Sequence, residues 1–205
     1  RRSSDLLLRV RNRGRVLAGK LTAGVYPGSD GTVEVIGAGT SLETGGTLEI
    51  GRGGTGRMTV FSGGLATAQD VLVGSNSGSN LLRLTGAGST LTIAKALRVG
   101  NTGTGQLTIQ QGARVILTGT YAEPNATESG LCHVGANAGA TGTVSVDGAG
   151  SALFGTHGFL NLGLVAGGNL TVTGGGEVDF AAISIVGGQN RTSSATISGT
   201  GSVVR

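Results

Sequence analysis

The feature that most constrains this chain is an internal repeat, in which a short apolar-x-apolar segment ends in glycine. The copies are Leu21–Gly24, Leu48–Gly51, Val71–Gly74, Leu97–Gly100, Cys132–Gly135, Leu160–Gly163 and, more loosely, Ile183–Gly187. Their glycines are spaced 27, 23, 26, 35, 28 and 24 residues apart. A period in this range is typical of solenoids, in which each coil contacts only its neighbours.

Two kinds of coil alternate within this repeat. The first carries Gly-x-Gly-Ser/Thr after an apolar-x-apolar strand and occupies 33–42, 82–91 and 144–153, with a partial copy from Ala195 to Ser202. The second reads apolar-Thr-apolar-x-x-Gly-Gly/Ala and occupies 58–66, 107–115 and 170–178, with a degraded copy at 8–16. The double unit is therefore about 50 residues long, as from Gly24 to Gly74.

These strand-like segments predict an all-β chain. Apolar and polar residues alternate over three to five positions, which is the signature of a sheet with one buried face. A single coil cannot bury that face, whereas stacked coils make a continuous core. We expect one domain over residues 1–205, a parallel β-solenoid of about eight coils and, at about 4.8 Å per coil, on the order of 38 Å long. A β-sandwich is disfavoured because it would not repeat one corner at nearly constant intervals.

The composition excludes two other classes. The chain has 42 glycines but 2 prolines and no strict Gly-X-Y period, so it is not collagen. It is 38% hydrophobic and 13% charged, whereas disordered chains are poor in apolar residues and rich in charge. There is no run of about 18 apolar residues, so no membrane span is expected. No signal peptide is recognised, and both ends look cut from something longer.

Charge is concentrated in the first coil, residues 1–24. Residues 1–20 hold seven basic side chains against Asp5, while the rest of the chain is nearly neutral. We take Arg9, Arg11, Arg13 and Arg15 as one candidate contact surface for an anionic partner, the alternative being a solvated terminal coil. Nucleic-acid binding is not expected, because residues 1–20 contain no aromatic side chain.

Possible catalytic and metal-binding motifs have structural explanations. The segment Gly86–Thr90 lacks the lysine of a phosphate loop and recurs as a corner. Cys132 aligns with apolar residues and is expected inside, while His133 aligns with mostly outward positions, so the two cannot chelate one ion. Glu177 and Asp179 lie two apart and share a strand face, either as an acid pair or as a solvated edge. We expect no catalytic residue, metal or cofactor.

One coil is about ten residues longer than its relatives, and the insertion spans 116–130. It carries Tyr121, Glu123 and Glu128, and Tyr121 is the aromatic that could anchor a partner. Insertions in solenoids leave as loops on one face and often bind. This loop is the second candidate contact surface, and a tolerated loop of no consequence is the alternative.

Segments such as 84–93 and 97–109 resemble the glycine-rich repeat of bacterial autotransporter (type V secretion) passengers and of some surface proteins with a PEP sorting tail. The resemblance covers most of the chain and implies a right-handed parallel β-helix on the bacterial surface or outside the cell. It implies a non-catalytic stalk or adhesin segment that contacts a host surface protein or glycan. The alternatives are a fragment of a polysaccharide-active β-helix enzyme and a self-assembling structural filament module. We expect the chain to be monomeric or to stack end to end. No translocator barrel or sorting tail is present in these residues.

Overall fold

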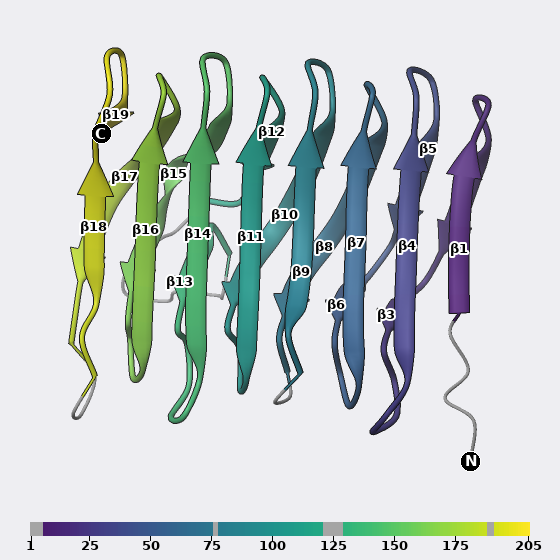
Figure 1. Ribbon diagram of the computed structural model, residues 1–205, viewed down its shortest axis with the longest axis horizontal. Helices are drawn as coiled ribbons and strands as arrows, with labels where there is room; N and C mark the ends of the chain where they lie inside the picture. The colour runs from purple at the N-terminus through teal and green to yellow at the C-terminus, as the bar shows by residue number, and fades with distance from the viewer. Residues whose placement is uncertain (1–5, 76–77, 121–128, 188–190) are drawn as a thin grey trace.

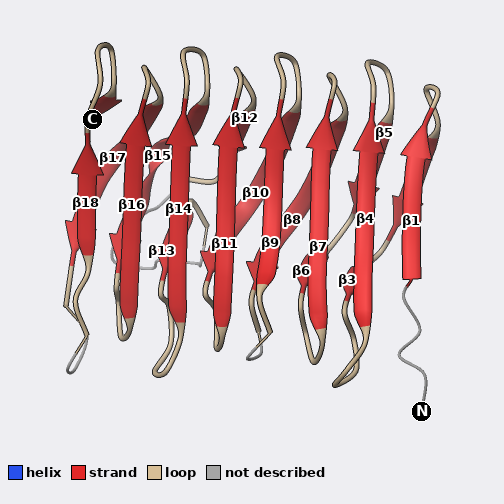
Figure 2. Ribbon diagram, viewed as in Figure 1, coloured by secondary structure: helices blue, strands red, loops and turns tan. Residues whose placement is uncertain are grey.

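A computed structural model describes residues 6–75, 78–120, 129–187 and 191–205. Every regular element in these residues is a β-strand, and Figure 2 shows strands joined by loops without a helix. The strands are β1 (Leu6–Arg11), β2 (Arg15–Ala18), β3 (Leu21–Ala23), β4 (Asp30–Ile36), β5 (Ser41–Thr44), β6 (Thr47–Ile50), β7 (Thr55–Phe61), β8 (Leu65–Val73), β9 (Asn80–Thr85), β10 (Thr90–Val99), β11 (Thr104–Gln110), β12 (Arg114–Leu117), β13 (Leu131–Val134), β14 (Thr141–Asp147), β15 (Ala152–Leu162), β16 (Gly167–Thr173), β17 (Glu177–Ile185), β18 (Ser194–Ile197) and β19 (Val203–Val204).

The strands form a parallel β-solenoid, which confirms the predicted fold class. The first wall is an eight-stranded sheet in the order β1-β4-β7-β9-β11-β14-β16-β18. An eleven-stranded sheet supplies the other two walls, since β8, β10, β15 and β17 each run through both. The second wall starts at β2 and β5, and the third contains β3, β6 and β13. In the described chain, seven coils have all three walls and an eighth has two strands, β18 and β19.

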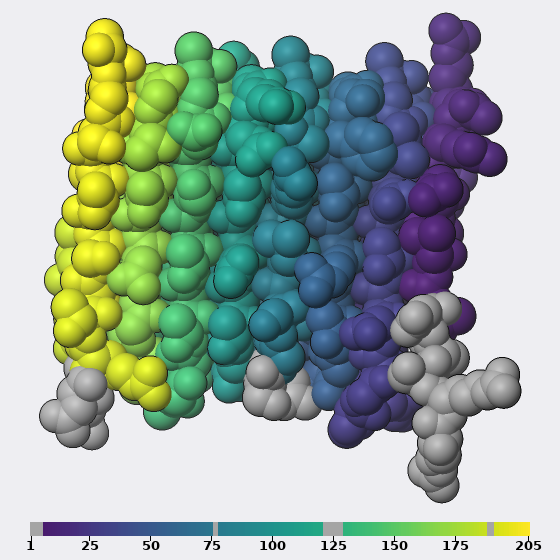
Figure 3. Space-filling model, viewed as in Figure 1, coloured from purple at the N-terminus to yellow at the C-terminus, as the bar shows by residue number. Residues whose placement is uncertain are grey.

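The coils follow one another along the rod in chain order. Figure 1 shows the strands of the first wall side by side, with the two termini at opposite ends. In Figure 3 the coils follow one another as successive bands from the first to the eighth. This arrangement is the quasi-one-dimensional architecture that the repeat predicts.

Inward-pointing side chains stack in columns from coil to coil. In the third wall, Leu48 pairs with Val71, Val71 with Leu97, and Leu97 with Cys132, which in turn pairs with Leu160. The register is the one obtained by aligning the terminal glycines, and all five side chains are buried. Valine, leucine and isoleucine fill most of the other columns of this core.

In the seventh coil, the residue that follows the third-wall strand is not the glycine that the sequence alignment places there. The sequence places Gly187 at the end of the last strand segment, but Leu160 pairs with Ile183 and Leu162 with Ile185. The amide of Val186 then donates to Leu162 O, so Val186 occupies the position that glycine holds in the other coils. The glycine-based alignment is therefore displaced by one residue in this coil.

Two kinds of corner join the first wall to the second, and they alternate along the rod. Figure 1 shows taller and shorter turns in alternation at the ends of the first-wall strands. The long corners are Gly37–Thr40, Gly86–Ser89, Gly148–Ser151 and Gly199–Ser202, and both glycines of each have positive φ. The short corners are Asn12–Gly14, Ser62–Gly64, Gln111–Ala113 and Gly174–Gly176, and the first two residues of each have positive φ.

A side-chain hydrogen bond couples each short corner to the long corner of the next coil. The last residue of the long corner is Ser or Thr, and its hydroxyl oxygen accepts the amide N–H of the middle residue of the short corner. The four bonds are Arg13 N to Thr40 Oγ1 at 3.1 Å, Gly63 N to Ser89 Oγ at 3.0 Å, Gly112 N to Ser151 Oγ at 2.9 Å and Gly175 N to Ser202 Oγ at 3.1 Å. Each bond gives a turn amide an acceptor in a partly buried place, which explains why the sequence repeats every two coils.

The opposite corner explains why so much glycine is needed. Gly100 ends the third-wall strand of its coil with φ +70°, and a Cβ there would lie 2.4 Å from Thr141 O at the start of β14. Gly142 faces it, and a Cβ on that residue would lie 2.2 Å from Val99 O. Backbones of adjacent coils therefore pack directly on one another, which leaves no room for a side chain.

One coil replaces a glycine of this contact by asparagine. Asn80 takes the position that Gly105 holds in the next coil, and its side chain is buried. Its Oδ1 accepts the Gly56 N–H at 2.8 Å, while its Nδ2 donates to Gly78 O at 2.7 Å and Thr104 O at 3.1 Å. The amide group thus bonds to three coils at once.

The buried position of Cys132 leads to a prediction about its reactivity. Burial raises the pKa of the Cys132 thiol to about 12, so the nucleophilic thiolate is scarce and inaccessible. We expect no reaction with a maleimide in the native protein and full reaction after denaturation, as measured by mass spectrometry. A Thr67→Cys variant, whose new thiol lies on an exposed strand face, should take up one label natively. Two labels on that native variant would contradict the inward position of Cys132.

Candidate functional site

The first candidate surface, the basic coil, is partly neutralised by acids of the second coil. Arg9 Nε lies 2.5 Å from Glu34 Oε2. Arg15 makes a bidentate pair with Glu43, with distances of 2.8 Å and 2.9 Å. The same bond from Arg15 lowers the pKa of Glu43 and raises that of Arg15. A third pair joins Lys20 Nζ to Glu49 Oε2 at 3.2 Å.

The two remaining arginines of this surface lie at the short corner of the first coil. Arg11 is exposed, and neither it nor Arg13 makes an ion pair with an acid in the described part of the chain. The side chain of Arg13 lies against the long corner of the second coil. A Cβ added to Gly39 in that corner would be 3.2 Å from Arg13 Cγ. Of the four arginines predicted as a contact surface, Arg11 and Arg13 are therefore the two whose charge is not already paired with an acid of the described chain.

This neutralisation was missed in the sequence, although a signal for it exists. Aligning the first strand of coil one on that of coil two pairs Leu8 with Val33 and therefore Arg9 with Glu34. The same operation in the second wall pairs Leu17 with Glu43 and brings Arg15 close to that acid. A net charge taken over the first coil alone does not reveal these ion pairs, because their acidic partners lie 25 and 28 residues further along the chain.

The second candidate surface, the insertion, falls mainly outside the described residues, and Tyr121, Glu123 and Glu128 are among those not described. Its two ends are described and lie together. The Thr118 amide donates to Ile93 O at 2.9 Å and the Gly130 amide to Lys95 O at 2.8 Å. A Cβ on Gly119 would be 2.5 Å from Gly130 N. The insertion thus leaves and re-enters at the bend between the second and third walls.

The insertion starts later than the sequence indicates. Residues 116 and 117 belong to β12, where Ile116 pairs with Thr92 and Leu117 with Ile93. The predicted range of 116–130 therefore begins two residues too early at its first end. The coil keeps its register on both sides, because β13 pairs with β10 and β15 after the excursion.

Beside this bend lies a row of outward polar residues, Arg98, His133 and Asn161, on three adjacent coils. His133 points away from Cys132, as expected, yet it is only 7% exposed. Asn161 Nδ2 lies 3.4 Å from His133 Nδ1. Ala96 and Leu131, which also point outward, are buried as well. No residue pattern marks this part of the outer surface as covered, so sequence reasoning had no signal for it.

The acid pair considered for a catalytic role is bridged by a cation. Glu177 and Asp179 do share the outer face of β17, as predicted from their spacing. The guanidinium of Arg205, in the eighth coil, forms an ion pair with Glu177 Oε1 and lies 3.9 Å from Asp179 Oδ2. An acid pair held by an arginine is a structural bridge between coils, whereas acid–base catalysis on a sugar needs two carboxyl groups that face the substrate.

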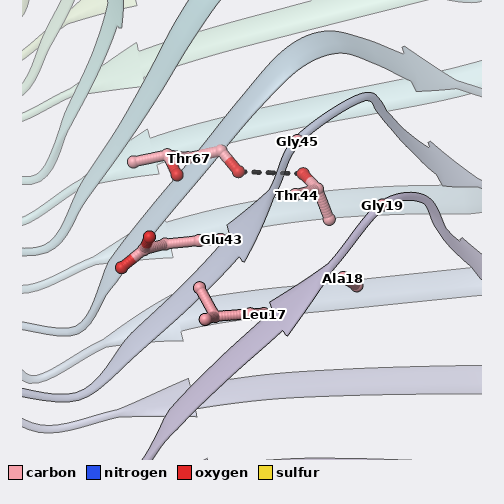
Figure 4. Close-up of a pocket in the computed structure, with 7 residues that line it drawn as sticks. All are labelled: Leu17, Ala18, Gly19, Glu43, Thr44, Gly45 and Thr67. Atoms are coloured by element: carbon pink, nitrogen blue, oxygen red, sulfur yellow. Dashed lines mark hydrogen bonds between the residues drawn. The ribbon is translucent and has the colours of Figure 1, made fainter.

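Two of the hollows in the described chain are lined by strands of the first coil. One, of about 410 Å³, is an open depression at the bend of coils one to three, and Figure 4 shows Leu17 and Glu43 beside it. The hydroxyl of Thr44 there donates to Thr67 O at 2.8 Å, so its polar group is already used within the rod (Figure 4). The other, of about 270 Å³, lies at the end of the core and is lined by apolar residues such as Leu6 and Leu8 together with polar ones such as Ser29 and Asp30.

Neither hollow gathers reactive groups. In the described residues, no three His, Cys, Asp or Glu side chains are grouped so that they could hold a metal ion. Within the same residues, no helix is long and apolar enough to cross a membrane. No protein-family model matches the sequence, and no curated protein and no solved structure is significantly similar to it.

Proposed function

We propose that this protein is a non-catalytic stalk, a segment of an extracellular or surface protein of bacteria of the kind that the glycine-rich repeat resembles. The observation that carries the proposal is that the conspicuous polar groups bond from coil to coil. The hydroxyls of the four long corners accept amides of the neighbouring coil, and Asn80 joins three coils. Side chains used in this way support a rigid rod rather than a reaction.

The rival function is a polysaccharide-active enzyme, and a turnover screen separates the two. Pectins, alginate and glycosaminoglycans are offered with and without calcium, and released reducing ends or unsaturated products are measured. We expect no turnover above that of a Glu177→Gln/Asp179→Asn variant. Reproducible turnover by the natural chain that this variant loses would establish the rival, because those two carboxylates are the acid pair that the fold provides.

A stalk of this type presents contact surfaces, and we place the principal one at the insertion and the bend from which it leaves. The rest of the rod offers small Ser, Thr and Gly side chains, whereas interface anchors are usually aromatic or arginine. The competing surface is Arg11 and Arg13, with Arg9 and Arg15 beside them already paired. Binding to host-cell glycans or surface proteins is measured for an Arg11→Ala/Arg13→Ala variant and for a chain with residues 120–129 replaced.

The two surfaces differ in their response to salt. Binding through the arginines should weaken steeply as salt rises, since the Debye length falls from about 10 Å at 0.1 M to about 3 Å at 1 M. Binding that rests on burial of Tyr121 should persist in part. If replacement of residues 120–129 leaves the binding of an identified partner unchanged, the insertion is not the contact surface.

Replacement of residues 120–129 by a short Gly-Ser turn should leave the rod folded. The anchoring bonds of Thr118 and Gly130 lie outside the replaced segment, and the ends are already adjacent. A shorter closing loop also costs less entropy. We expect the free energy of unfolding to change by less than about 1 kcal/mol, which corresponds to about 2–4 °C in the melting temperature. A much larger drop, or native labelling of Cys132, would show that the insertion is part of the fold.

A further inference from the structure

A third hollow, of about 450 Å³, lies where the third wall turns into the first, in the turns that follow coils one, two and three. Its lining includes the starts of β4 and β7 and the turns themselves, with Pro27, Asp30, Gly53, Gly54, Thr55 and Gly78. These turns stand at the lower end of the first wall in Figure 1. The volume falls within the range of about 300–1,000 Å³ that small-molecule sites occupy.

Two polar side chains of this hollow have no partner in the described chain. Asp30 and Thr55 lie side by side in register at the starts of β4 and β7. The Asp30 carboxylate is exposed and forms no ion pair, and neither it nor the Thr55 hydroxyl takes part in a side-chain hydrogen bond within the described residues. A carboxylate that accepts and a hydroxyl that both donates and accepts are therefore left for an external ligand.

A guanidinium group lies next to these two groups without closing on the carboxylate. Arg57 follows Thr55 by two residues on β7, so it shares the outer face, where it is exposed. With strands about 4.8 Å apart and a rise of about 3.3 Å per residue, the Cα atoms of Asp30 and Arg57 are about 8 Å apart. These two form no ion pair, whereas Arg9 and Glu34, which are directly in register, do. A donor and an acceptor thus stand at the hollow, both available.

The rim of the hollow is a turn with a fixed backbone, Tyr26–Ser29, which carries Pro27. The Ser29 hydroxyl donates to Tyr26 O at 2.7 Å and accepts the Tyr26 N–H at 3.1 Å. Ser29 O accepts the Thr55 amide at 2.9 Å, which ties the turn to β7. A rim that is already ordered loses little conformational freedom when a ligand binds.

Glycine keeps the floor of the hollow open. A Cβ on Gly54 would lie 2.2 Å from Ser29 O, so the backbone packs directly under the rim. Gly78 differs, because its φ is not in the left-handed region and a Cβ there would be 3.4 Å from Gly54 O and 3.5 Å from Thr55 Oγ1. A side chain at position 78 would therefore point into the hollow without straining the backbone. The bare glycine floor lets a ligand approach the main chain closely.

We propose that this hollow binds a neutral hexose, as one unit of a glycan. The Asp30 carboxylate accepts hydrogen bonds from two neighbouring sugar hydroxyls, Thr55 and Arg57 bind others, and Pro27 contacts the C–H face of the ring. A uronate or a sulfated sugar is disfavoured, because its charge would meet that of Asp30. A metal ion is disfavoured as well, since one carboxylate beside an arginine is a poor set of ligands. The site uses no residue of 116–130, and it is independent of the stalk function because it rests on this hollow alone.

A titration followed by ¹H–¹⁵N NMR tests the proposal on the 205-residue chain, with cellotriose, mannotriose and galactotriose as probes. We expect saturable shifts of the Gly53, Gly54 and Gly78 amides with one of the three, and a dissociation constant on the order of 1 mM. The affinity should be equal at about 0.1 M and 1 M salt, because the ligand carries no charge to screen. Asp30→Asn and Arg57→Gln should each lower it about tenfold, since a hydrogen bond to a charged group contributes about this factor.

Matched variants separate the hollow from the rest of the rod. Gly78→Leu fills the hollow and should abolish binding, whereas Gly19→Leu, at a glycine that also lacks a left-handed φ and lies outside the hollow, should bind as the natural chain does. Asp70→Asn and Arg114→Gln remove the same charges elsewhere and should leave the affinity unchanged. Should Gly78→Leu fail to fold, Asp30→Asn against Asp70→Asn decides. No saturable shift with any probe, tighter binding of an acidic trisaccharide, or shifts that persist in a folded Gly78→Leu chain would overturn the proposal.

Discussion

Replacing Gly100 by alanine is expected to destabilise the rod by more than about 3 kcal/mol. The residue has φ +70°, a left-handed conformation that costs a non-glycine residue about 1–2 kcal/mol. The added Cβ would also lie 2.4 Å from Thr141 O and 2.6 Å from Gly142 N, both backbone atoms of β14. Neither can move without separating two coils, so the clash adds to the conformational cost.

Two matched variants separate these contributions in urea unfolding. Gly139 has φ +80°, but a Cβ at this position would meet no atom within 4 Å, so Gly139→Ala should show the conformational cost alone, about 1–2 kcal/mol. Gly19 has neither the positive φ nor a neighbour within 4 Å, and Gly19→Ala should be within about 0.5 kcal/mol of the natural chain. Equal losses for Gly100→Ala and Gly139→Ala would show that adjacent coils do not pack backbone on backbone at this corner.

Replacing Asn80 by alanine is expected to cost about 2–4 kcal/mol. The change leaves the Gly56 N–H without its acceptor and removes the donor to Gly78 O and Thr104 O in a buried place. A buried polar group that loses its partner costs about 1–3 kcal/mol. The control is Asn101→Ala, since Asn101 is less buried and its side-chain bonds are longer: its Nδ2 donates to Ser75 Oγ at 3.3 Å and its Oδ1 accepts from Asn137 Nδ2 at 3.2 Å. That variant should lose about 1 kcal/mol or less.

Asn80→Asp adds a pH signature that a packing defect alone would lack. The carboxylate keeps an acceptor for Gly56 N–H, but it faces two carbonyl oxygens and is buried. Both effects raise the pKa of this carboxyl in the folded state above its value in the unfolded chain. The defect relative to the natural chain should therefore be largest near neutral pH and shrink as pH falls and the acid becomes protonated. A defect that is independent of pH would place Asn80 in contact with solvent.

The fold could be predicted from the sequence because its corners need particular residues. Glycines such as Gly51, Gly74 and Gly100 mark one position in each coil, and aligning them yields the correct pairing of Leu97 with Cys132 across the longest coil. The alternation of Gly-x-Gly-Ser/Thr with the shorter corner was also visible in the sequence. Its cause was not, because the hydrogen bond from an amide of the short corner to the hydroxyl of Ser89, or of the equivalent residue, joins two coils. Val186 shows where the alignment stops working, because it takes the position of the marker glycine and Gly187 lies one residue further on.

The candidate surfaces were harder to predict, because side-chain partners on adjacent coils are distant in sequence. The neutralisation of Arg9 by Glu34 follows from the register but not from local charge. Arg205 reaches the acids of β17 from a different coil, so the spacing of Glu177 and Asp179 alone could not show that an arginine bridges them. His133 was expected at an outward position, but its burial was not predicted, since alternation along a strand specifies a face and not what lies above it.

The stacking of coils in one register, through the insertion, is the central claim. It places Thr108 of β11 directly beside Ser145 of β14, both on the outer face of the first wall and on either side of the insertion in sequence. Parallel neighbours lie about 4.8 Å apart, within the Cα range that a disulfide can bridge. In a Cys132→Val background, Thr108→Cys and Ser145→Cys should therefore form a disulfide on mild oxidation.

The measurement that tests this claim most directly compares that pair with one displaced by a single residue. In Thr108→Cys with Val144→Cys the second thiol points into the core, because Val144 is the buried neighbour of Ser145. We predict cross-linking of the first pair and not of the second, read from the mass of the intact chain after denaturation in the presence of a thiol trap. Cross-linking of both pairs, or of the displaced pair alone, would contradict the register.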